Sequence, residues 1–107
     1  MEQSLVTPQF DDAGLLVNPG DWSPELASEL ARHEAIPQLT DLHWDFINSL
    51  RSYYYRYQVP PPASLICHDL NQNDWCCHDL FHNCLAAWRI AGLPDPGEEA
   101  KSYMSAE

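Results

Sequence analysis

The chain is 107 residues long, enough for one domain with a modest core. A hydrophobic content of 45%, with four Trp, five Tyr and three Phe, is typical of a folded protein. Sixteen acidic against five basic residues give a formal net charge of -11, which disfavours binding to nucleic-acid phosphates and anionic lipids. No apolar run approaches the roughly 20 residues that span a bilayer, and the start MEQSLVTPQF is unlike a signal peptide. We therefore expect a cytoplasmic protein without membrane contact.

The N-terminal part of the chain predicts a small β element followed by a helix. Turn-forming residues surround a short apolar run, and two short strands at 4–7 and 14–17, paired as a hairpin, fit this pattern. A helix should begin after Ser23, which can cap it, because Pro24 is favoured in a first turn. Pro37 requires that this helix end shortly before it.

The rest of the chain predicts three further helices. Thr40 can cap a long helix, in which apolar and aromatic residues recur at spacings of three and four up to Tyr57. The prolines at 60–62 end that helix and begin the next one. A fourth helix is expected to run without interruption to Gly92, with one apolar stripe formed by Cys77, Phe81, Cys84 and Trp88. The predicted fold is mainly α (α+β): a small helical bundle with a short N-terminal β-hairpin and a C-terminal arm.

Three segments in this order resemble the DsrC/TusE family of small sulfur-relay proteins. They read GDWSPE, LHWDFINSLRSYYYRYQVPP and IAGLPDP, and the resemblance runs from about Phe10 to Pro96. The family fold is a small helical bundle with an N-terminal β-hairpin, which agrees with the elements expected above. The resemblance implies a domain at residues 1–96 and a C-terminal tail at 97–107, which we expect to be loose because of its charge and small residues.

The resemblance also implies sulfur chemistry at cysteines that this chain lacks. Family members carry sulfur on a cysteine at the tip of a flexible C-terminal arm, and many have a second cysteine just before the AGLP-type segment. Here the upstream position falls on Trp88, and the terminal position falls near Glu98 or Glu99. A carboxylate cannot accept sulfane sulfur, because the reacting group must be a thiolate. We therefore expect the usual carrier chemistry to be absent and assign no catalytic residue.

The four cysteines elsewhere leave a relocated sulfur carrier open as an alternative. Because the chain has no CxxC pair, and because a reducing compartment is expected, we predict thiols and no disulfide framework. Cys67, Cys77 and Cys84 lie on apolar stripes and should be buried. Cys76 lies off the stripe and is the best candidate for an exposed thiol, and Cys84, one turn before Trp88, is the second candidate.

A metal site is a further alternative. Asp74, His78 and His82 are spaced i, i+4 and i+8, which would place them on one face of a continuous helix. Two histidines four residues apart on a helix can bind zinc. A solvated polar face explains the same spacing, because no second dense pair of ligands is evident. His43 is given no role, and no cofactor is expected.

The second predicted helix carries the candidates for partner contact. Together with the preceding helix it resembles a helix-turn-helix motif. Its start is acidic and it has only two arginines, so this resemblance does not indicate nucleic-acid binding. Helical spacing turns Tyr55 away from the core, unlike its neighbours Tyr53, Tyr54 and Tyr57. An exposed Tyr55 beside Arg51 is a candidate contact, because Tyr and Arg are enriched in interfaces.

The sequence favours a binding or regulatory protein over an enzyme. The predicted function is that of a DsrC/TusE-like protein that docks on sulfur-transfer or sulfite-reductase-type partners without carrying sulfur. A carrier that uses Cys76 or Cys84, and a metal-binding domain that uses His78 and His82, remain the alternatives.

Overall fold

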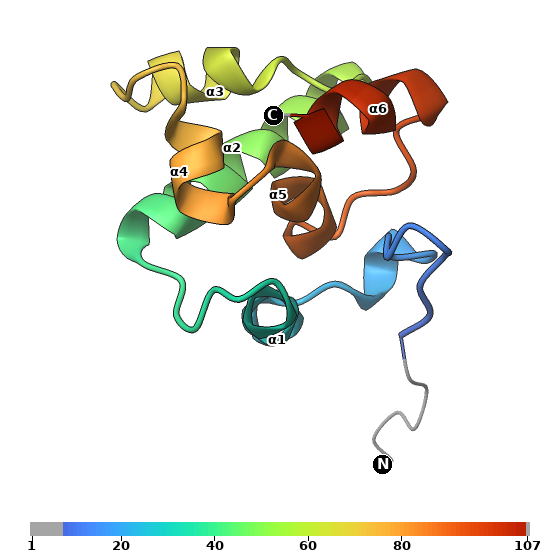
Figure 1. The fold of residues 1–107 in the computed structure, drawn as a ribbon. Coiled ribbons are helices and arrows are strands. Elements are labelled where there is room, and N and C mark those ends of the chain that lie inside the picture. The colour runs from blue at the N-terminus through green and yellow to red at the C-terminus, as the bar shows by residue number, and fades with distance from the viewer. Residues whose placement is uncertain (1–7, 107) are drawn as a thin grey trace.

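The computed structural model describes residues 8–106 and is mainly helical (Figure 1). In chain order it contains a short 3₁₀ helix, η1 (Pro19–Asp21), and the α-helices α1 (Pro24–His33), α2 (Asp41–Tyr57), α3 (Ala63–Asp69), α4 (Cys76–Phe81), α5 (Cys84–Ile90) and α6 (Glu98–Ala106). The predicted mainly helical bundle is confirmed. Among the described residues, none of these helices has both the length and the apolar character needed to cross a bilayer.

The N-terminal β element is smaller than the predicted hairpin. Phe10 and Leu16 form one isolated antiparallel bridge, and the Asp11 amide donates to the Leu15 carbonyl at 2.9 Å. The Asp11 carboxylate accepts the backbone N–H of Leu15 at 3.0 Å, which stabilises the reversal between them. The predicted strand at 4–7 lies outside the described residues, so the hairpin as a whole stays a prediction.

Side-chain caps fix the starts of the first two long helices where the sequence predicts them. The Ser23 hydroxyl accepts the Leu26 N–H, with Pro24 in the first turn of α1. Thr40 and His43 form a reciprocal capping box at the start of α2. The Nε2 atom of His43 lies 2.8 Å from the Leu80 carbonyl oxygen, so this buried ring also connects α2 to α4. No pattern in the sequence indicates that second contact.

The predicted continuous fourth helix is wrong, because it is two helices. His82 has a φ of 75°, a left-handed conformation that interrupts the helical hydrogen bonds after Phe81. Asn83 then caps α5, where its side-chain oxygen accepts the Ala86 N–H at 2.8 Å. The break turns α5 away from α4. Phe81 of α4 and Trp88 of α5 are both buried in the core.

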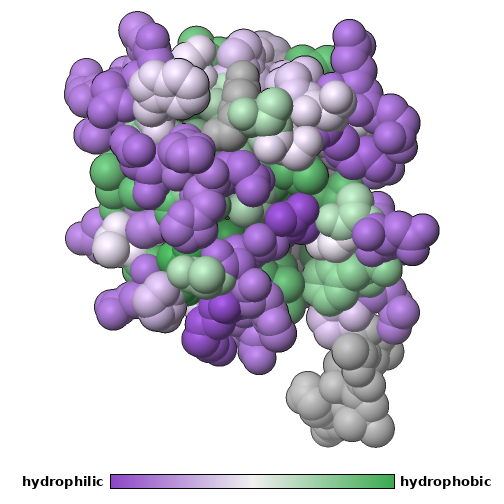
Figure 2. Space-filling view, in the orientation of Figure 1, coloured by the Kyte–Doolittle hydropathy of each residue, from purple (hydrophilic) through white to green (hydrophobic). Residues whose placement is uncertain are grey.

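Helix α5 is central to the packing, and α1, α2, α4 and α6 all contact it (Figure 1). Five of its seven residues are buried: Cys84, Ala86, Ala87, Trp88 and Ile90. The small side chains of Ala86 and Ala87 let neighbouring helices approach closely, while the larger Trp88 and Ile90 fill the space between the helices. On the face shown in Figure 2, hydrophilic residues surround and separate the apolar ones, as expected for a charged surface over one core.

Three groups from distant parts of the chain meet at the carboxyl end of α5. The indole N–H of Trp22 donates to the Ile90 carbonyl at 2.9 Å, and Nη1 of Arg51 donates to the Ala91 carbonyl at 2.6 Å. The Arg51 guanidinium stacks on the Trp22 ring, 3.8 Å from its centroid. These bonds satisfy carbonyls that have no partner within the helix and join η1, α2 and α5.

The structure differs from the loose tail expected at 97–107. Residues 98–106 form α6, which packs on α5 and buries Ala100 and Met104. These two residues are four positions apart and therefore share one helix face. The charge and small residues of this segment suggested disorder, but the apolar pair is enough to dock it on the core that α5 provides.

We predict that Gly92→Ala destabilises the protein more than Gly97→Ala does. Both glycines have positive φ, at 70° and 102°, so each substitution carries a backbone cost of about 1 kcal/mol. An added Cβ at Gly92 would also overlap the Trp22 side chain, whereas nothing lies within 4 Å at Gly97. Overpacking adds about 1–3 kcal/mol at position 92 only. Urea unfolding measures the free energy of unfolding of the two variants. An equal decrease in both would contradict the close packing of Trp22 against Gly92.

Candidate functional site

Trp88, on which the resemblance places the family's upstream cysteine, is buried in the core. Its side chain is 1% exposed, and its indole N–H donates to the Pro94 carbonyl at 2.7 Å. The ring meets Tyr54 edge to face, with centroids 5.4 Å apart. Trp88 therefore fastens the segment after α5 to the helix itself.

Glu98 and Glu99, at the terminal position, form the first turn of α6. The Asp95 carboxylate accepts the Gly97 N–H at 2.8 Å and the Lys101 ammonium at 3.1 Å, and these two bonds hold the pKa of Asp95 below its usual value. Lys101 also pairs with Glu98 at 3.1 Å, and its carboxylate partners raise the pKa of the ammonium. The segment that resembles a mobile arm is thus held at its start by local ion pairs.

Helix α6 covers Cys84. A cavity of about 20 Å³ remains between α6 and the core, and its walls include Cys84, Trp88, Tyr103 and Met104. Cys84 is 7% exposed. Cys84, one turn before Trp88, is therefore a buried thiol that α6 covers on one side.

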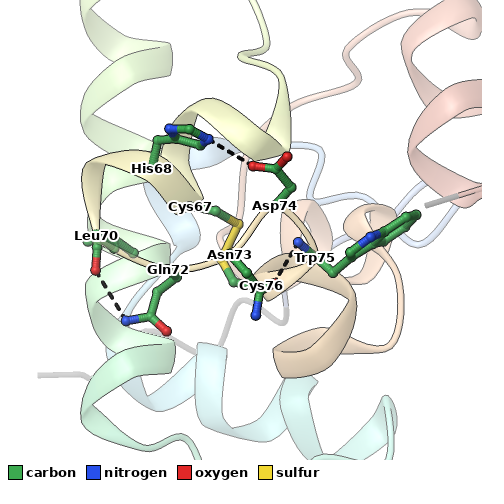
Figure 3. Close-up of a disulfide and its surroundings, with 8 residues drawn as sticks. All are labelled: Cys67, His68, Leu70, Gln72, Asn73, Asp74, Trp75 and Cys76. Atoms are coloured by element: carbon green, nitrogen blue, oxygen red, sulfur yellow. Dashed lines mark hydrogen bonds and ion pairs between the residues drawn. A yellow bond between two sulfur atoms is a disulfide. The ribbon is translucent and has the colours of Figure 1, made fainter.

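The prediction of four thiols is wrong for two of them, because Cys67 and Cys76 form a disulfide (Figure 3). Their Cα atoms are 5.8 Å apart, within the range that a disulfide requires. The chain reverses between α3 and α4 at Asn71, which has a φ of 59°, and the Gln72 N–H donates back to the Cys67 carbonyl at 2.8 Å. This reversal returns the start of α4 to α3, and the sequence spacing alone did not indicate it.

The burial of the cysteines partly follows expectation. Cys67, Cys77 and Cys84 are buried as predicted, and the latter two remain thiols. Cys76, expected to be an exposed thiol, is only 4% exposed and is bonded to Cys67. It lies against α3 because the chain reverses at Asn71 and brings the start of α4 back to Cys67.

The structure does not bring the predicted metal ligands onto one helical face. Asp74 precedes α4 and lies 2.8 Å from Nε2 of His68, while His82 follows the last residue of α4 in a left-handed conformation. His78 stands between them on α4, with its ring 6.3 Å from that of Trp75. In residues 8–106 no three His, Cys, Asp or Glu side chains gather closely enough to hold a metal ion. The i, i+4, i+8 argument fails because the helix is shorter than expected.

Arg51 and Tyr55, the candidate partner contacts, have different environments. Arg51 is partly buried and is occupied by Trp22 and the Ala91 carbonyl, so its first role is structural. Tyr55 is 46% exposed, in agreement with helical spacing, and its ring centroid lies 5.3 Å from the Arg51 guanidinium carbon. Tyr57 was expected to face the core but is 53% exposed at the last residue of α2.

Trp75 is a surface feature that the sequence analysis passed over. It is 65% exposed, more than any other large apolar residue in the described part of the chain. A cavity of about 230 Å³ lies beside it, and its walls include Cys77, His78 and Cys84. The only signal in the sequence is a Trp directly after the polar turn Asn71-Gln72-Asn73-Asp74.

We predict that the Cys67–Cys76 bond forms in the air-oxidised protein and stabilises it. Alkylation under denaturing conditions without reductant should label Cys77 and Cys84 and spare the other pair. Because the bond closes a loop with a sequence separation of 9, reduction should lower the free energy of unfolding by about 2–3 kcal/mol. In the double variant Cys67→Ser/Cys76→Ser, reductant should have no effect. Labelling of all four cysteines before reduction would contradict the bond.

Comparison with known proteins assigns the chain to a family. Residues 4–98 match the family model described as DsrC like protein. Two relatives named sulfurtransferase TusE, from Buchnera aphidicola subsp. Schizaphis graminum and from Sodalis glossinidius, are 34% and 35% identical over 95 residues. These alignments cover 80% of this chain and 82% and 87% of the two relatives.

Solved structures agree with that match. The oxidized gamma-subunit of the dissimilatory sulfite reductase (DsrC) from Archaeoglobus fulgidus has a TM-score of 0.73 at 31% identity, covering 85% of this chain and 90% of its own. Allochromatium vinosum DsrC has a TM-score of 0.71 at 32% identity, covering 92% and 95%. Because sequence and structure agree over most of its length, this chain belongs to the DsrC/TusE family of sulfur-relay proteins.

Proposed function

We propose that this protein is a non-carrier member of its family, which binds sulfur-relay or sulfite-reductase-type partners and modulates them without carrying sulfur. The observation that carries the proposal is the buried Trp88, hydrogen-bonded to Pro94, at the upstream cysteine position. A thiolate at that position could attack a persulfide or disulfide sulfur, whereas an indole can only pack and donate one hydrogen bond.

The C-terminal segment supports the same conclusion. Residues 85–107 contain no cysteine, and α6 is docked by Ala100 and Met104. Sulfur transfer needs a thiolate that can enter a partner's active site. A docked helix that begins with Glu98 and Glu99 supplies neither the nucleophile nor the freedom to present it.

The relatives suggest the class of partner. One structural relative is named as the gamma-subunit of a dissimilatory sulfite reductase, and the sequence relatives are named sulfurtransferases. A family member that keeps the scaffold can occupy the same docking site on such a protein. By binding there without a reactive cysteine, it would limit access for the members that do carry sulfur.

The relocated-carrier alternative depends on Cys76 or Cys84. Cys76 is bonded to Cys67, and Cys84 is only 7% exposed, although it lines the cavity beside Trp75. A metal-binding function through His78 and His82 has weaker support, because the helix that would have aligned them is interrupted. The non-carrier function therefore accounts for more of the observed contacts.

We predict that the reduced protein gains no sulfur when incubated with a low-molecular-weight persulfide donor. Intact-mass spectrometry should find an unchanged mass, while a cysteine-bearing family member treated in parallel gains sulfur. A gain that disappears on prior alkylation, and in Cys76→Ser or Cys84→Ser, would reject the proposal and favour the relocated carrier.

We also expect competition between this protein and a cysteine-bearing family member. A purified dissimilatory sulfite reductase, immobilised with its own gamma-subunit removed, should bind this chain, and added chain should reduce binding of the gamma-subunit. The heat-unfolded chain serves as the control for nonspecific adsorption. Absence of competition at saturating concentrations, for this partner and for a partner of the sulfurtransferase relatives, would overturn the docking role.

A further inference from the structure

Trp75 lies on the loop between α3 and α4, at the rim of the cavity of about 230 Å³. Pro62 and Ala63 at the start of α3 form the opposite wall, and Cys77 and Cys84 also line the cavity. Figure 3 shows the indole directed away from the disulfide and from the loop that carries it. A tryptophan that is 65% exposed beside a cavity is typical of an interface anchor. Its large apolar surface is in contact with water in the free protein, and covering it with a partner lowers the free energy.

The loop holds Trp75 in a defined position. The Asn73 side-chain oxygen accepts the Trp75 N–H at 2.8 Å, and the Trp75 carbonyl accepts the Asp79 N–H at 3.0 Å. The Cys67–Cys76 bond then fixes the adjacent residue to α3. Because the backbone on both sides is held before any partner arrives, little conformational entropy is lost on binding.

The charges around Trp75 indicate the occupant. From residue 57 to residue 88 the sequence has no Lys or Arg, but it has Asp69, Asp74 and Asp79. Asp74 lines the cavity beside the indole and contacts the exposed His68 at 2.8 Å. An indole face next to a carboxylate attracts a cationic side chain, and Arg is the cation found most often on aromatic rings.

We propose that the Trp75 surface, defined as Trp75, Asp74 and the adjoining cavity, docks a basic segment of a partner protein. An arginine of that segment stacks on the Trp75 ring and pairs with Asp74, and a neighbouring apolar side chain enters the cavity. This inference rests on the proposed binding function and names the chemistry of the partner. The disulfide contributes by holding the loop in the conformation that presents the indole.

The test uses a synthetic peptide with capped ends that alternates arginine and leucine, and a matched peptide in which glutamate replaces arginine. Binding to the full, air-oxidised chain is followed by titration calorimetry and by the NMR signal of the Trp75 indole N–H. The arginine peptide should bind and shift that signal, and the glutamate peptide should not. No binding of the arginine peptide, or equal binding of both peptides, would overturn the proposal.

Variants then locate the site. Trp75→Ala should weaken binding of the arginine peptide at least tenfold, and Asp74→Asn should weaken it several-fold. Tyr57→Ala is the matched control, because it removes another exposed aromatic ring, 53% exposed and outside the cavity, and it should bind like the unaltered protein. Thermal unfolding checks that each variant is folded, which is expected because Asp74 and Trp75 are both exposed. Binding that survives Trp75→Ala, or that Tyr57→Ala weakens equally, would exclude this surface.

These results are separable from the test of the proposed function. Sulfur loading or a lack of competition would overturn the non-carrier docking role whatever the peptide does. If the chain competes for its partner while Trp75→Ala competes equally well and the arginine peptide does not bind, only the Trp75 surface is rejected.

Discussion

The packing of this protein depends on the carboxyl end of α5, where the carbonyls of Ile90 and Ala91 accept Trp22 and Arg51. A helix end leaves its last carbonyls without partners inside the helix, so their burial requires donors from elsewhere. Trp22 comes from the N-terminal region and Arg51 from α2, and the two stack on each other. Gly92 lacks a side chain and therefore lets the indole lie against the chain. With its end fixed in this way, α5 can serve as the centre on which α1, α2, α4 and α6 pack.

The same helix determines what the C-terminal segment can do. Trp88 bonds to Pro94 after the helix end, and α6 then folds back over Cys84 and Trp88. Within the described residues, α6 is packed on the core through Ala100 and Met104, and ion pairs of Lys101 with Asp95 and Glu98 hold the start of the segment together. The chain keeps the family fold, and its C-terminal segment packs on the core through α6.

The loop between α3 and α4 carries the most exposed large apolar residue in the described part of the chain. The Cys67–Cys76 disulfide lies there, and the residue directly before Cys76 is the exposed Trp75. A rigid loop with an apolar ring and a neighbouring carboxylate is suited to binding and contains no nucleophile of its own. In the described structure Cys67 and Cys76 are bonded to each other, Cys77 and Cys84 are buried thiols, and Trp75 is exposed.

The sequence by itself determined the features that depend on neighbouring residues. Ser23 and Thr40 indicated helix starts, because a capping side chain bonds within three residues of itself. The order of GDWSPE and IAGLPDP indicated the family from the sequence alone. The tertiary structure decided the features that depend on which distant segments of the chain come into contact. The left-handed His82 splits the expected helix, the reversal at Asn71 brings Cys67 to Cys76, and an available face on α5 orders a tail that looked loose. Periodicity did not indicate these outcomes. The disulfide and the docking of α6 depend on contacts between segments that only the folded chain places together, whereas the Asn83 cap after His82 is a local signal that the periodic pattern concealed.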